Sequence, residues 1–197
     1  MTLSRDAAWS LLCEWVSSDS LRRHCLAVQA AMRWQASAKS ADVDLWGITG
    51  LLHDLDYERH PDPGSGHPRM AMAELERLGY PAEMVRAIGS HAAYMNIPRE
   101  SELELSLAAV DELCGFVLAC AYVRPQGIHG LTAKSVKKKL KAPSFAAAVS
   151  REDIHEGARL LDVSFDEHLH GVIAALQPHA AELGVDGDGP AAGSPAG

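Results

Sequence analysis

The chain has 197 residues, of which 47% are hydrophobic and 6% aromatic, and its formal net charge at pH 7 is −8. This length supports one domain with a substantial core and gives no strong reason for two. The acidic charge argues against bulk binding of nucleic acid, because phosphate backbones would be repelled. No apolar run reaches the length of a bilayer-spanning helix, so we expect no membrane partner.

Abundant alanine and leucine with few aromatic residues favour helices packed on helices. In chain order, capping residues, prolines and glycines predict helices over residues 6–16, 20–38, 42–54, 67–78, 81–91, 102–123, 132–141, 150–161 and 166–176. The prolines and glycines between 56 and 66 predict a loop. We therefore predict an all-α fold, with one helical domain over residues 1–177 and a flexible tail over 178–197.

The four cysteines, Cys13, Cys25, Cys114 and Cys120, lie in apolar helical contexts and form no CxxC pair. Free cysteine in such a context behaves as a small hydrophobic residue. The first six residues also lack the apolar stretch of a signal peptide. We expect reduced core thiols in a cytoplasmic protein.

Two histidines lie on apolar helix faces. His24 shares its face with Leu21 and Val28, and His91 follows Ile88. A single buried histidine is usually a neutral imidazole whose hydrogen bonds are satisfied locally. Neither residue alone therefore identifies a metal ligand.

Asp111 is harder to explain as an isolated residue. Its helix face carries Leu107, Cys114 and Leu118, which are all apolar. An isolated carboxylate on such a face costs several kcal/mol or stays protonated. Asp111 therefore needs a metal or a set of donors, and a buried salt bridge is the alternative.

His53 and Asp54 are adjacent and follow the apolar segment 46–52. Neighbours in a helix point about 100° apart, so both reach one ion only where the helix ends. A histidine favoured by the helix dipole, followed by an aspartate that starts a loop, is the alternative. His67 opens the next helix and could equally be an exposed residue at a helix start.

The ordered set favours a metal centre over separate explanations. These histidines and aspartates occur on successive helices and mostly face inward: His24, His53, Asp54, His67, His91 and Asp111. Imidazole together with carboxylate is a ligand set for iron, manganese, cobalt, nickel or zinc. One metal centre satisfies all of these side chains together.

This set resembles the HD-domain superfamily, which is named for its adjacent histidine and aspartate. The similar region covers about 21–123, so the remaining helices, about 131–177, form a C-terminal extension. The resemblance implies a compact helical bundle with one or two divalent ions, drawn from Fe, Mn, Co, Ni, Mg and Zn. It implies one ion held by His24, His53, Asp54 and Asp111, and a second held by His67 and His91 with Asp54 as the bridge.

The resemblance also implies a metal-dependent hydrolase, namely a phosphohydrolase that acts on a nucleotide or another small phosphorylated metabolite. Metal-activated water is the expected nucleophile, and Asp54, Asp56 or Glu58 could accept its proton. Many members carry a lysine shortly after the doublet, and Arg59 is the cation in the corresponding segment here.

A basic stripe stands outside this pattern. Lys134, Lys137, Lys138 and Lys141 recur at helical spacing, and we call them the lysine stripe. Most charge runs are solvated faces. A stripe beside the metal pocket could instead bind the phosphates of a nucleotide.

Two other functions fit the same residues. A two-iron site of this superfamily can oxidise a substrate with oxygen, and the matches at His67 and His91 permit such a site. A non-catalytic helical module could bind metal structurally or sense a ligand. The sequence does not determine the oligomeric state.

Overall fold

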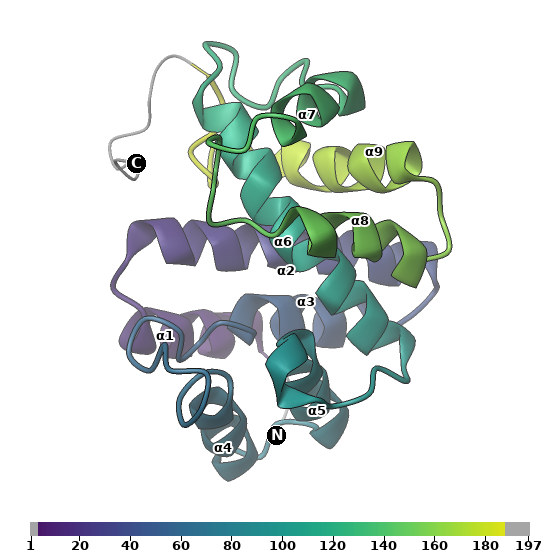
Figure 1. The fold of residues 1–197 in the computed structure, drawn as a ribbon. Helices are drawn as coiled ribbons and strands as arrows, with labels where there is room; N and C mark the ends of the chain where they lie inside the picture. The colour runs from purple at the N-terminus through teal and green to yellow at the C-terminus, as the bar shows by residue number, and fades with distance from the viewer. Residues whose placement is uncertain (1–3, 188–197) are drawn as a thin grey trace.

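The computed structural model describes residues 4–187, and within that range the chain contains nine α-helices and no strand. The predicted all-α fold is confirmed (Figure 1). The helices, with two short 3-10 turns, are α1 (Arg5–Trp15), α2 (Asp19–Ala38), α3 (Val43–Leu52), α4 (Arg69–Arg77), α5 (Ala82–His91), η1 (Ala93–Met95), α6 (Glu102–Tyr122), α7 (Ala133–Leu140), α8 (Arg151–Leu160), α9 (Phe165–Leu176) and η2 (Gln177–His179).

Polar side chains fix where these helices begin. The Ser18 hydroxyl accepts a hydrogen bond from the Leu21 amide at the start of α2. The Asp42 carboxylate accepts from the Asp44 and Leu45 amides at the start of α3. Ser101 and Ser164 each form a full capping box with the glutamate three residues later. Because these caps satisfy amides that have no partner within the helix, the helix starts fall close to their predicted positions.

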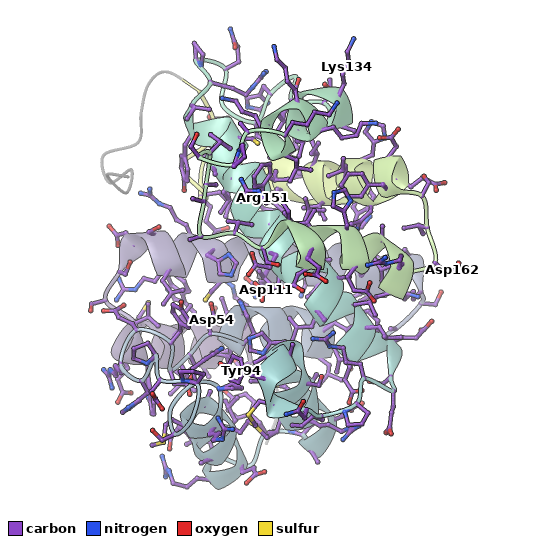
Figure 2. All side chains as sticks on the ribbon, viewed as in Figure 1. Asp54, Tyr94, Asp111, Lys134, Arg151 and Asp162 are labelled. Carbon is purple, nitrogen blue, oxygen red and sulfur yellow. The ribbon has the colours of Figure 1, made fainter. Side chains whose placement is uncertain are left out.

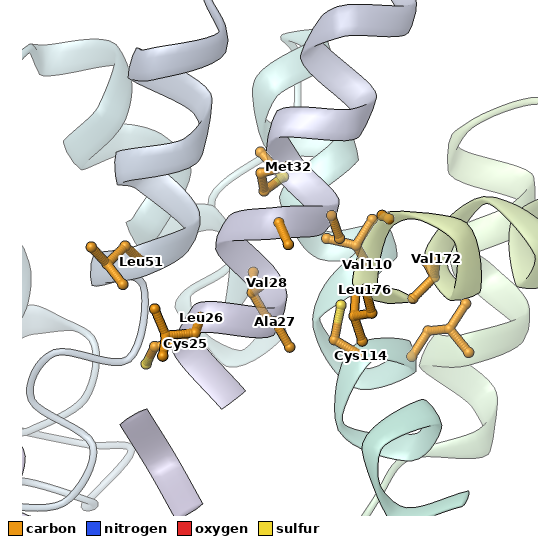
Figure 3. Packing of buried hydrophobic residues seen from close by; sticks show 14 of the residues in the cluster. Cys25, Leu26, Ala27, Val28, Met32, Leu51, Val110, Cys114, Val172 and Leu176 are labelled. Carbon is orange, nitrogen blue, oxygen red and sulfur yellow. The ribbon is translucent and has the colours of Figure 1, made fainter. Parts of the chain in front are cut away.

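The core forms where α2 packs along α3 and where α6 crosses both α2 and α8. In Figure 1, α6 runs through the middle of the molecule, with α4 and α5 toward one end and α7 and α9 toward the other. Figure 3 shows Val28 of α2, Val110 and Cys114 of α6, and Leu176 of α9 in one buried cluster. The contact between α2 and α3 is close at Gly50, where an added Cβ would lie 2.8 Å from the Val28 carbonyl oxygen.

Helix α6 corrects one expectation from the sequence. It is long and apolar enough to span a bilayer by length and composition, with a mean hydropathy of 1.6 over its best window. However, 61% of that window is buried inside the protein, which is the environment of a core helix. Its apolar surface is therefore used in packing against the other helices.

The packed chain extends past the expected domain end at 177. Leu183 and Val185, which were assigned to the flexible tail, are 0% and 2% exposed. The Ile128 amide donates to the Val185 carbonyl oxygen at 2.8 Å, so this segment is tied to the loop after α6. Residues 178–187 therefore belong to the domain, and the rest of the expected tail, 188–197, lies outside the described residues.

Candidate metal centre

Three helices, the turn after α3 and the loop before α4 bring the six predicted ligands to one place. His24 comes from α2, His91 ends α5 and Asp111 lies in α6, while His67 precedes α4. Helix α3 ends at Leu52, so His53 and Asp54 lie in the turn that follows it, as the metal interpretation requires. Figure 2 shows Asp54 and Asp111 close together near the middle of the molecule.

The first group of three side chains is His24, His53 and Asp111. The Nε2 atom of His24 lies 2.9 Å from Asp111 Oδ1 and 3.2 Å from His53 Nε2. Asp54 Oδ2 lies 3.7 Å from His24 Nε2 and 3.5 Å from His53 Nε2. Four side chains thus surround one point with nitrogen and oxygen atoms.

The second group is Asp54, His67 and His91. The Nε2 atoms of His67 and His91 are 3.2 Å apart. Asp54 Oδ1 lies 3.5 Å from the first nitrogen and 3.7 Å from the second. The two oxygens of Asp54 therefore face different groups, which is the arrangement of a carboxylate that bridges two ions.

Hydrogen bonds on the far side of three imidazole rings test whether a cation fits. His53 Nδ1 lies 2.8 Å from the Gly50 carbonyl oxygen, His91 Nδ1 lies 2.5 Å from the Ile88 carbonyl oxygen, and His67 Nδ1 lies 2.8 Å from Asp56 Oδ1. With the proton on Nδ1, each ring donates there and presents an unprotonated Nε2. The Nε2 lone pairs of His67 and His91 then face each other, which is favourable only with a cation between them.

The electrostatics of the cluster agree with this test. Burial alone would lower the pKa of His53, but the charges of Asp54 and Asp111 raise it to about 9. Burial would likewise raise the pKa of Asp111, yet His53 and His24 hold that pKa well below its usual range. The cluster therefore stabilises added positive charge, which a divalent ion would supply.

The two groups open into a cavity of about 610 Å³. Its wall includes Tyr57 and Tyr94, which are 49% and 45% exposed. The charged side chains that line it, besides those of the metal centre, are Arg99, Glu112, Asp153 and Glu156. A small organic molecule could therefore reach the metal centre from solvent.

Asp56 and Glu58 have other partners than those expected. Asp56 is fully buried, its Oδ1 accepts from His67 and its Oδ2 accepts from the Ala71 amide at 2.8 Å. Glu58 accepts from the backbone amides of Ser17 and Ser18, which lie in the α1–α2 turn. Their expected role as proton acceptors is therefore corrected: Asp56 orients His67, and Glu58 caps a turn.

The expected substrate-binding cations also lie elsewhere. Arg59 donates to the Glu14 carbonyl oxygen and stacks on the Trp15 ring at 5.2 Å. Neither it nor the lysine stripe lines the cavity, and Figure 2 shows Lys134 at one end of the molecule, away from Asp54 near its middle. Lys137 pairs with Asp166 at 2.5 Å, and its neighbours Lys134 and Lys138 are exposed, so the stripe is a solvated face.

Several polar side chains of the cavity were not predicted from the sequence, among them Tyr94, Arg99 and Glu112. Tyr94 and Arg99 lie in the irregular segment between α5 and α6, where no periodicity assigns a face. Glu112 follows Asp111, a candidate ligand, so its position at the edge of the inward face was the signal available. Burial first, and then the charge of Asp111, raises the pKa of Glu112 to about 7, and its Oε2 accepts from the Ser150 amide.

Comparison with known proteins gives one match. Residues 21–116 match the family model described as HD domain. Searches of curated proteins and of solved structures found no match. The matched residues run from the start of α2 to Phe116 in α6, and they include all six side chains of the centre.

Proposed function

Since the chain belongs to the HD-domain superfamily through residues 21–116, we propose that it is a metal-dependent phosphohydrolase of a small phosphorylated metabolite. The observation that carries this proposal is Asp54, whose two oxygens face two separate groups of ligand atoms. A pair of adjacent divalent ions suits displacement at phosphorus, because it can stabilise both the attacking and the leaving oxygen.

The donor set favours a transition metal over magnesium. Four imidazoles and two carboxylates make up the centre, and Mg²⁺ prefers an octahedron of oxygen atoms that includes several waters. His24, His53 and Asp111 would hold one ion, His67 and His91 the other, and Asp54 both. When bound, the ions would supply activated water at neutral pH and offset the charge of the phosphoryl oxygens.

The protein's own residues then have distinct tasks. Asp56 and two backbone carbonyls keep the imidazole rings in the orientation that presents Nε2. Glu112 is a carboxylate of the cavity wall that is outside the metal centre and is half-buried, so we propose it as the proton acceptor or donor. Tyr57 and Tyr94 offer aromatic surface to the organic part of the substrate.

A second candidate is oxidation of the substrate by a two-iron site. The observation that favours it is the number of imidazole ligands, since iron is among the metals that such a set binds well. The same site without turnover would be a structural or ligand-sensing metal centre. We also propose a cytoplasmic location, which agrees with four free cysteines in the described residues.

Metal content and turnover together test the proposal. Elemental analysis would be done on wild type, Asp54→Ala and His67→Ala, each purified without added metal or chelator, followed by a screen of phosphate esters. We expect about two ions in wild type, about one in His67→Ala and none in Asp54→Ala, with metal-dependent release of phosphate from an ester. Redox-active iron with substrate-dependent oxygen uptake would favour the oxidase. A wild type that cannot be loaded with metal would contradict the hydrolase, the oxidase and the structural or ligand-sensing metal centre alike.

A further inference from the structure

The cavity above the metal centre contains one strong cation. Among the described residues that line it, Arg99 is the only arginine or lysine. It lies between η1 and α6, and its side chain is half-buried. The cations predicted from sequence lie outside the cavity, so Arg99 and the metal centre are the cationic groups that an anionic substrate would meet there.

Hydrogen bonds to the end of α5 fix the guanidinium. Arg99 Nε donates to the Ser90 carbonyl oxygen and Nη2 donates to the His91 carbonyl oxygen, both at 2.9 Å. These carbonyls belong to the last turn of the helix, where carbonyl oxygens have no partner within the helix. The same turn carries the ligand His91, so the guanidinium is held at a fixed place relative to the metal centre.

One side of the guanidinium stays available. Within residues 4–187, Nη1 has no hydrogen-bond partner and no carboxylate forms an ion pair with Arg99. The other arginine of this region, Arg86, is paired with Glu100 and Glu104. The charge of Arg99 is therefore not neutralised by the protein, and a planar guanidinium with a free N–H edge is suited to phosphoryl oxygens.

We infer that Arg99 is the substrate-binding cation of this site and that it holds a phosphoryl oxygen of the substrate while the metal centre holds the others. The nature of the anion rests on the proposed function. The binding itself needs only the cavity, the metal centre and the unpaired charge.

The acidic side chains of the cavity limit the rest of the substrate. Glu112 of α6 and Asp153 and Glu156 of α8 line the cavity, and only Glu156 has a cationic partner, Arg159. A second anionic group on the substrate would be repelled there. The substrate class is therefore a phosphate monoester whose remaining part is uncharged or bears an amine, and nucleoside diphosphates and triphosphates are disfavoured.

Binding of inorganic phosphate to the manganese-loaded full chain tests the role of Arg99, with calorimetry as the readout and metal content measured for every variant. Arg99→Gln keeps a donor for the backbone carbonyls but removes the charge, and Arg99→Lys keeps the charge. We expect phosphate binding to weaken about 10- to 100-fold in Arg99→Gln and much less in Arg99→Lys. Arg59→Ala, outside the cavity, is the matched control and should bind phosphate as wild type does.

The opposite order, with Arg99→Gln close to wild type and Arg99→Lys impaired, would show that Arg99 acts only through the carbonyls and would overturn the inference. So would a metal-loaded wild type that binds no phosphate. Calorimetry needs no turnover, so a protein that hydrolyses no ester but loses phosphate affinity in Arg99→Gln would support the inference and count against the proposed function. A protein that hydrolyses esters with an unchanged KM in Arg99→Gln would support the proposed function and count against the inference on Arg99.

A matched pair of esters tests the substrate class. Phosphoglycolate carries a carboxylate where 2-hydroxyethyl phosphate carries a hydroxymethyl group, and the two are otherwise alike. We expect the metal-loaded protein to bind 2-hydroxyethyl phosphate several times more tightly, and the double variant Asp153→Asn, Glu156→Gln to narrow that difference. Equal or tighter binding of phosphoglycolate by wild type would overturn the limit on substrate charge.

Discussion

The metal centre and helix α7 use charged side chains in opposite ways. In the metal centre, six side chains from three helices and two connecting segments converge until their ligand atoms lie within 4.8 Å of one another in each group. On α7, the lysine stripe runs along one helix and points toward solvent, with one surface pair to Asp166. Like charges at helical spacing need only a solvated surface, whereas converging, partly buried imidazoles and carboxylates would be stabilised by a bound cation.

The largest expected difference in turnover is between a substitution in the metal centre and substitutions in the lysine stripe. His53→Ala removes a fully buried ligand, so we expect its turnover to fall on the order of 10³-fold, with loss of bound metal. Replacement of Lys134, Lys137 and Lys138 by glutamine should leave turnover within about twofold, because exposed charges contribute little. Steady-state kinetics and elemental analysis on the same preparations would measure both. A large loss of turnover in the lysine variant would mean that the lysine stripe takes part in substrate binding.

Two carboxylates close together in the chain, Asp56 and Glu58, allow a second comparison, this time of metal affinity. Asp56→Asn disturbs the hydrogen bond that orients His67, and loss of such a partner typically lowers metal affinity about 10- to 100-fold. Glu58→Gln, two residues along the chain, changes only a turn cap and should bind metal as wild type does. Metal titration with a competing chelator would compare the two variants. Equal affinities in both would show that Asp56 does not support the second ion.

The contrast also shows which parts of the site a sequence can reveal. Most of the ligand positions could be predicted because each is a polar residue where helical periodicity or a helix end requires an explanation, whereas His67 was included only as part of the ordered set. His24 and Asp111 stand on apolar faces, and the doublet His53–Asp54 stands where α3 ends. Periodicity identifies a buried face within one helix, and the common chemistry of the residues supplies the link between helices.

The same reasoning fails where a loop decides the direction of a side chain. Asp56, Glu58 and Arg59 lie in successive turns after α3, and their side chains point to His67, to the α1–α2 turn and to Trp15, respectively. Nothing in the local sequence distinguishes these three directions. Arg99 was missed for the same reason, because its position depends on carbonyl oxygens at the end of α5.

The helices outside the HD region pack against the HD helices, and a substitution at Gly157 of α8 tests how close that packing is. An added Cβ at Gly157 of α8 would lie 2.5 Å from the Ala109 carbonyl oxygen in α6, so the backbones would have to separate. We expect Gly157→Ala to lower the free energy of unfolding by about 1–3 kcal/mol. Gly171→Ala in α9 is the control, since its Cβ would meet only Trp34 Nε1 at 3.6 Å. Urea denaturation would measure both, and an unchanged midpoint for Gly157→Ala would mean that α8 and α6 can move apart at little cost.

His168, beside this contact, is a buried histidine that needs no metal. It is 2% exposed, its Nε2 donates to the Ala109 carbonyl oxygen at 3.0 Å, and its Nδ1 has no partner among the described residues. Burial lowers its pKa to about 4, although the hydrogen bond to Ala109 opposes the shift. The protein therefore holds this ring neutral, whereas the unfolded chain would protonate it near its ordinary pKa of 6.5.

The smallest expected effect is the pH dependence that follows from this shift. Because the folded pKa is depressed, the stabilising contribution is complete above about pH 6.5 and is lost as the pH falls toward 4. Between pH 7 and pH 5, wild type should lose at most about 2 kcal/mol more stability than His168→Gln, which keeps a donor for Ala109 but does not titrate. Urea denaturation of the two proteins at both pH values would measure the difference, and the metal-centre histidines cancel because both proteins carry them. Equal losses would mean that the ring is also neutral in the unfolded chain, or that water reaches it in the folded one.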